Sequence, residues 1–232
     1  MQVLSKIHVF YSIAIIGHIW YIDSMKWEEL LQIVGREPVF SSSLLKAGSV
    51  DPIDLGKQLS RWVNSGKLIQ IRRGLYALSE RYRKIQPHPF YIANRIQRAS
   101  YISLYSALSY YGLIPEYVPA VTSITTGRPQ TFNIPLGDFI FRHIKKELFF
   151  EYKLIDIENN QSAFIASPEK SLLDLLYLTP GSDALLYLRE LRLQNLDRLN
   201  MEQFKTTAYH MGSRKLIRAA ESLDRLIKEV AE

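Results

Sequence analysis

Six polar side chains between residues 57 and 73 are of the types that bind nucleic acid. Lysine and arginine donate hydrogen bonds to phosphate oxygens, and arginine and glutamine also pair with base edges. The six residues are Lys57, Gln58, Arg61, Lys67, Arg72 and Arg73. Lys57, Gln58 and Arg61 are close in sequence, and Arg72 and Arg73 are adjacent. Whether these residues act together depends on the secondary-structure elements that carry them.

The first three residues belong to a predicted amphipathic helix. Asp51 is a favourable N-cap and Pro52 suits the first helical position. Apolar residues then recur at i, i+4, i+7 and i+8, namely Leu55, Leu59, Trp62 and Val63. Because these four form one stripe, the opposite face is polar and mainly basic, and it carries Lys57, Gln58 and Arg61.

The two adjacent arginines belong to a predicted β-hairpin. Residues 68–73 alternate in polarity as a strand does, Gly74 permits a tight turn, and residues 75–78 make the return strand. Arg72 and Arg73 are therefore expected at the tip of the hairpin.

Two shorter helices are expected before these elements. Residues 27–34 have apolar side chains at helical spacing and end at Gly35. Serines 41–43 can cap a short helix through residues 44–47, which Gly48 would stop. Three helices followed by a hairpin predict a winged helix over residues 25–84, with the third helix in a DNA major groove and the hairpin on phosphates.

The charge distribution agrees with a polyanionic partner for this segment. The whole chain has a formal net charge of +6. Residues 25–86 contain eleven Lys and Arg and six Asp and Glu, whereas residues 87–232 contain seventeen and sixteen. A local positive excess favours nucleic acid, and an acidic protein or a membrane surface would also be attracted to it.

Residues 85–232 predict a larger α+β domain behind this module. Alternating segments at 121–126, 138–143, 149–157 and 162–165 indicate an antiparallel sheet built from local hairpins. Helices are expected at residues 91–96, after a cap at Ser100, and after Ser167 and Pro168. Two or three C-terminal helices are expected after residue 184.

Tyrosines are dense near the start of this second domain, at positions 91, 101, 105, 110, 111 and 117. Aromatic side chains can stack on bases in proteins that bind single strands. Because these tyrosines follow helical spacing, a core rich in rings is the favoured interpretation.

The sequence offers no pattern of known catalytic or metal chemistry. The chain has no cysteine, its five histidines are scattered, and a Gly-rich phosphate loop and a G-x-S-x-G motif are missing. No enzyme activity, metal or cofactor is therefore expected. One alternative is a Mg²⁺-dependent nuclease set made of Asp156, Glu158, Glu169 and Lys170. Arg128 and Arg142 are a further candidate binding surface.

Several segments in order resemble the AbiEi family of antitoxins and transcriptional regulators, over residues 26–178. The segment Gly66 to Leu78, GKLIQIRRGLYAL, looks like the wing of that family. The segments 92–94, 100–104 and 106–114 follow, and then residues 166–174, ASPEKSLLD.

The resemblance implies a DNA-binding autorepressor and antitoxin of a type IV toxin–antitoxin, or abortive infection, system that acts in phage defence. Such a protein binds double-stranded promoter repeats and neutralises a nucleotidyltransferase-like toxin, without a need for direct contact. A cytoplasmic location and no membrane association are expected. A winged-helix regulator without a toxin is the alternative.

The first 24 residues are apolar and stand apart from this pattern. Residues 7–22 are mainly apolar, but His8, Ser12 and His18 interrupt them, and the run is shorter than a spanning helix needs. The segment is either an extra element packed on the body or a stretch upstream of a natural start at Met25.

Overall fold

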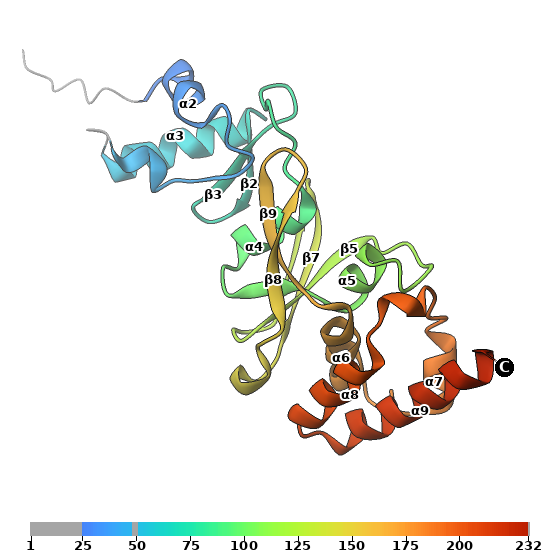
Figure 1. The fold of residues 1–232 in the computed structure, drawn as a ribbon. Coiled ribbons are helices and arrows are strands. Elements are labelled where there is room, and N and C mark those ends of the chain that lie inside the picture. The colour runs from blue at the N-terminus through green and yellow to red at the C-terminus, as the bar shows by residue number, and fades with distance from the viewer. Residues whose placement is uncertain (1–24, 48–50, 232) are drawn as a thin grey trace, which may run out of the picture. The chain divides into compact units, whose positions relative to one another are not determined.

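A computed structural model describes residues 25–47 and 51–231, and it divides the chain into two compact units between Lys84 and Ile85. Each unit contains both helices and β-strands, so the architecture is α+β (Figure 1). Residues 1–24, interpreted above as an apolar extension, and Gly48 lie outside the described residues.

The first unit consists of three helical segments and three short strands. In chain order these are α2 (Trp27–Val34), β1 (Phe40–Ser41), the 3-10 turn η1 (Leu44–Ala47), α3 (Pro52–Asn64), β2 (Leu68–Arg72) and β3 (Leu75–Leu78). The strands form an antiparallel sheet of order β1-β3-β2, in which Phe40 pairs with Tyr76. The predicted hairpin is confirmed. The predicted second helix is only a 3-10 turn, because Ser41 pairs with Leu75 in the sheet.

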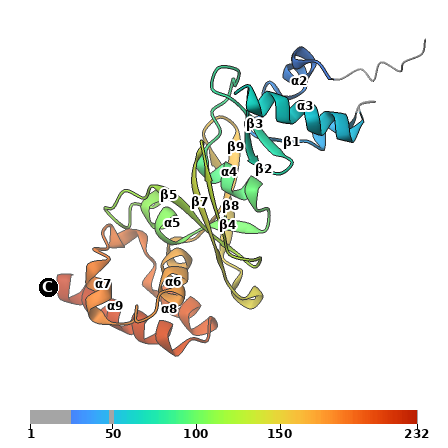
Figure 2. The same cartoon turned by 180° about the vertical axis from the view of Figure 1, so that it is seen from behind.

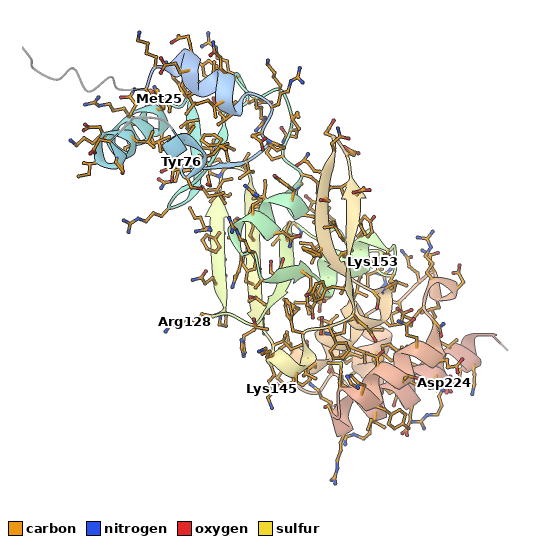
Figure 3. All side chains as sticks on the ribbon, turned by 60° about the vertical axis from the view of Figure 1, so that its left-hand side comes forward. Met25, Tyr76, Arg128, Lys145, Lys153 and Asp224 are labelled. Carbon is orange, nitrogen blue, oxygen red and sulfur yellow. The ribbon has the colours of Figure 1, made fainter. Side chains whose placement is uncertain are left out.

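A hydrophobic core joins these elements. Leu30 and Val34 of α2 are fully buried, and they meet the apolar side of α3 and the sheet. Met25 and Tyr76, labelled in Figure 3, are also buried in this core. Burial of one stripe of α3 leaves its opposite side in solvent.

The second unit has six strands and six α-helices among the described residues. In chain order the elements are α4 (Pro89–Ile96), β4 (Ser100–Ile102), α5 (Leu104–Tyr110), β5 (Ala120–Thr125), β6 (Gln130–Ile134), β7 (Gly137–His143), η2 (Lys146–Leu148), β8 (Tyr152–Ile157), β9 (Gln161–Ala166), α6 (Pro168–Leu178), α7 (Leu185–Glu190), η3 (Leu196–Arg198), α8 (Met201–His210) and α9 (Arg214–Ala231).

The sheet of this unit is mixed, so the prediction of an antiparallel sheet was wrong. Its order is β6-β7-β5-β4-β9-β8. β5 runs parallel to β7, and β4 runs parallel to β9. After β5 the chain forms β6, a strand that was not predicted, at the edge of the sheet. It then turns back through β7, which lies between β6 and β5 and runs parallel to β5.

Ser100 was also placed wrongly as a helix cap. It begins β4, where it pairs with Thr125, and the N-cap of α5 is Ser103. Tyr101 and Ile102, the two residues before that cap, are fully buried and belong to a short strand, which periodicity alone does not separate from a helix.

The start of α6 agrees with its sequence signal. Ser167 Oγ accepts from the Lys170 backbone N–H at 3.1 Å, and Pro168 occupies the first turn. Most side chains of α6 are buried in the main core of the unit. Figures 1 and 2 show α6 to α9 grouped at one end of this unit, away from the turn between β8 and β9.

Candidate nucleic-acid interface

Helix α3 is held firmly at its start. The Asp51 carboxylate accepts from the backbone N–H groups of Ile53 at 2.7 Å and Asp54 at 3.3 Å. An N-cap of this kind satisfies donors that the helix itself leaves free. Leu55, Leu59 and Trp62 are buried beneath the helix, so its rotation about its own axis is fixed by packing.

The opposite side of α3 presents a continuous exposed row, which we call the α3 surface stripe. Its members follow one another at intervals of three or four residues or are adjacent in sequence, and all are exposed. They are Ile53, Gly56, Lys57, Ser60, Arg61 and Asn64. The stripe combines hydrogen-bond donors, two cations and one apolar side chain, Ile53, which is 69% exposed. These groups suit phosphates, base edges and a thymine methyl, respectively.

Gly56 lies in the middle of the stripe and has no packing reason to be glycine. A Cβ atom built at this position would meet nothing within 4 Å. Glycine inside a helix costs about 1 kcal/mol relative to alanine. A glycine that destabilises an exposed helix face allows another surface to approach the backbone closely.

The structure brings two predicted site residues onto this stripe and places the third at its edge. Lys57 Nζ lies 3.0 Å from Asp54 Oδ1, in an exposed i,i+3 ion pair. Arg61 Nη1 donates to Gln58 Oε1 at 3.3 Å. Gln58 is half-buried, so its amide orients Arg61 rather than standing free in solvent.

Lys67 is engaged within the first unit. Its Nζ lies 5.0 Å from the ring centroid of Trp27, above the ring, and the residue is half-buried. Trp27 in turn meets Trp62 edge to face at 5.2 Å. Lys67 therefore takes part in packing through a cation–π contact and is less available than the exposed cations.

Arg72 and Arg73 lie at the turn between β2 and β3, as predicted. Gly74 has φ +76°, a conformation that favours glycine, and its carbonyl accepts from the Ser42 N–H at 2.9 Å. Both arginines are exposed, and neither makes an ion pair with any residue that the structure describes. Two free guanidinium groups on an anchored turn can bind phosphates.

The residues of the nuclease alternative are not assembled as a site. Glu169 is 4% exposed and accepts from the Asn200 N–H at 2.8 Å. Lys170 is fully buried, whereas Asp156 and Glu158 are exposed on β8 and the turn that follows it. Over residues 25–47 and 51–231, no group of three His, Asp or Glu residues is placed to hold a metal ion.

Lys170 belongs to a buried polar cluster that the sequence pattern did not reveal. Its ammonium group contacts the Asp174 carboxylate and donates to Tyr101 Oη at 2.9 Å. Asp174 Oδ2 also accepts from Tyr101 Oη at 3.0 Å and from Ser103 Oγ at 2.8 Å. Burial raises the pKa of Asp174, and Lys170 opposes that shift. The i,i+4 spacing of Lys170 and Asp174 was the available signal.

The tyrosine prediction holds for part of the cluster only. Tyr101 is fully buried, and Tyr111 Oη donates to the Ala166 carbonyl at 3.0 Å. Tyr110 and Tyr117 are 48% and 88% exposed. Helical spacing therefore overestimated how many of these rings enter the core.

Arg128 and Arg142 remain exposed on the second unit. Arg128 projects from the loop between β5 and β6 (Figure 3), and Arg142 lies near the end of β7. Neither forms an ion pair within the described part of the chain.

No helix among the described residues is long and apolar enough to cross a membrane. The chain matches no protein-family model, and no curated protein is significantly similar to it.

Proposed function

We propose that residues 25–84 are a winged helix that binds double-stranded DNA. In this arrangement α3 enters the major groove, and the turn between β2 and β3 is the tip of the wing on the phosphate backbone. The α3 surface stripe and the exposed Arg72–Arg73 pair support this assignment.

The observation that carries the proposal is the composition of the α3 surface stripe. A helix face that only meets solvent has no use for an unpacked central glycine, which costs stability. Lys57 and Arg61 flank Gly56 with donors for phosphates and bases, whereas Ser60 Oγ donates to the Gly56 carbonyl at 3.0 Å. A close approach of DNA to this face accounts for Gly56, Lys57 and Arg61 together.

We further propose that the protein represses its own operon and serves as the antitoxin of a nucleotidyltransferase-like toxin in phage defence. The order of segments that resemble the AbiEi family supports this role, and the repressor part also has the support of the α3 surface stripe. The operator would be a promoter repeat, and the toxin need not be contacted directly.

A gel-shift titration tests the DNA-binding part. The full chain is titrated against its own upstream DNA and a scrambled duplex at two salt concentrations. Preferential binding that weakens steeply with salt is expected, because released counterions drive much of the affinity. Arg61→Ala should reduce the preference, with Arg225→Ala at an exposed position of α9 as the matched control. Equal affinity for both duplexes would exclude sequence-specific binding by this chain.

Co-expression tests the antitoxin part separately. A neighbouring nucleotidyltransferase-like gene is induced with and without this chain, and colony growth is counted. Rescue of growth by the chain is expected. If the chain binds its DNA specifically but does not relieve growth arrest, it is a winged-helix regulator without a toxin.

A further inference from the structure

We propose that the second unit binds an organic cation with a flat, aromatic-sized body, in a hollow of about 480 Å³ between α4, α5 and the start of β7. The volume suits a small molecule, since ligand pockets span about 300 to 1,000 Å³. All of its lining residues lie between positions 88 and 139. The proposal therefore does not depend on DNA binding by residues 25–84.

Aromatic rings make the side walls of this hollow. Phe90, Tyr110 and Tyr117 line it, and the centroids of Phe90 and Tyr110 are 5.9 Å apart. Phe139, which is fully buried, is also among the lining residues. The faces of such rings carry a negative partial charge, so they attract cations as well as flat apolar groups.

The charge of the lining has one sign. Asp138 is the one acidic residue among the described residues that line the hollow, and no Lys or Arg is among them. One oxygen of its carboxylate accepts from Asn133 Nδ2 at 2.8 Å. His88 also lines it, and burial lowers the pKa of this imidazole. Its Nδ1 accepts from the Phe90 N–H at 3.1 Å, so the ring is neutral at pH 7 and does not repel a cation.

This combination is unusual on a chain with a net charge of +6. Aromatic faces together with one carboxylate recognise guanidinium, amidinium or ammonium groups, because both attract positive charge. The aromatic lining residues favour a ligand whose charged head is attached to a planar body. Asp138 would repel an anion, so the hollow favours a cation over an anion.

Isothermal titration of the full chain with benzamidine and with benzamide tests the proposal, because these probes have nearly the same shape and differ in charge. Benzamidine is expected to bind at least about tenfold more tightly than neutral benzamide. Asp138→Asn should lower the affinity for benzamidine several-fold and leave the affinity for benzamide unchanged. Asp156→Asn, an exposed carboxylate on β8 outside the hollow, is the matched control and should change neither.

Tyr110→Leu separates the aromatic wall from the carboxylate. It should further lower the affinity for benzamidine. The far-ultraviolet circular dichroism should stay unchanged, because Tyr110 is half-exposed and its loss does not disturb the fold. The proposal would be overturned if the two probes bound equally or if benzamidine did not bind measurably at millimolar concentration. It would also be overturned if Asp138→Asn and Asp156→Asn had equal effects on benzamidine binding.

Discussion

At the scale of single residues, the Lys170–Asp174 pair is the most consequential polar contact of the second unit. Both side chains are completely buried, and Tyr101 and Ser103 satisfy the remaining hydrogen bonds of the carboxylate. Removing one member of a buried ion pair costs about 3 to 5 kcal/mol, because the other charge is left without compensation. The cluster therefore fixes α6 against β4.

Lys170→Met is expected to lower the free energy of unfolding by about 3 kcal/mol or more. The double variant Lys170→Met with Asp174→Asn should recover at least half of that loss, since a neutral amide still accepts from Ser103 and Tyr101. Urea unfolding followed by circular dichroism measures both. A single variant as stable as the parent would show that the ion pair does not stabilise the fold.

At the scale of elements, the turn between β2 and β3 is expected to supply affinity without selectivity. Arg72→Ala with Arg73→Ala should weaken binding to specific and scrambled duplexes by the same factor. Each lost phosphate contact reduces the slope of log K against log salt by about 0.9, so the double variant should lose about two units of slope. Fluorescence anisotropy over a salt series measures it. An unchanged slope would mean that the turn does not touch DNA.

The cap of α4 gives the second unit a pH response. His88 Nδ1 accepts from the Phe90 N–H, and burial holds the pKa of His88 below its ordinary value of 6.5, although Glu158 opposes the shift. The unfolded chain then binds the proton more readily than the folded chain. The contribution to stability is therefore complete above about pH 6.5 and is lost as the pH falls, by at most about 1.4 kcal/mol per pH unit.

His88→Asn should remove this part of the pH dependence, because asparagine caps helices without titrating in this range. Urea unfolding at pH 7.5 and 5.5 gives the difference, with His143→Asn at an exposed histidine as the control. If the parent and His88→Asn lose the same stability between pH 7.5 and pH 5.5, His88 is not the source of the pH dependence.

The elements that the sequence predicted well are those with local signals. Asp51 with Pro52 and Ser167 with Pro168 start α3 and α6 because a cap and a fixed φ act within one turn. The parallel pairing of β5 with β7 had no local signal, since β6 lies between them in sequence. Of the candidate site, Arg61 and Arg72 were predicted, whereas the open space around Gly56 follows from three-dimensional packing and has no sequence signal.

At the scale of the whole molecule, each of the two compact units has a hydrophobic core of its own, which implies two sets of local stabilities. Asp51→Ala removes the cap of α3, a loss of about 1 kcal/mol. It should speed amide hydrogen exchange in peptides from residues 25–84 and leave peptides from residues 85–231 unchanged. Lys170→Met should give the opposite pattern. Exchange that rises everywhere in both variants would show that the chain unfolds as one cooperative body.

If DNA approaches the α3 surface stripe closely, a side chain added at Gly56 must interfere with it, and Gly56→Ala is the variant to measure first. Alanine should raise the free energy of unfolding by about 1 kcal/mol, because nothing crowds the new methyl group in the free protein. In the complex that methyl group meets DNA, and affinity for the upstream duplex should fall about tenfold, as overpacking of a close interface does. Gln32→Ala, at an exposed position of α2, should leave affinity unchanged. A more stable Gly56→Ala protein that binds the upstream duplex as tightly as the parent would show that DNA does not approach this face of α3 closely.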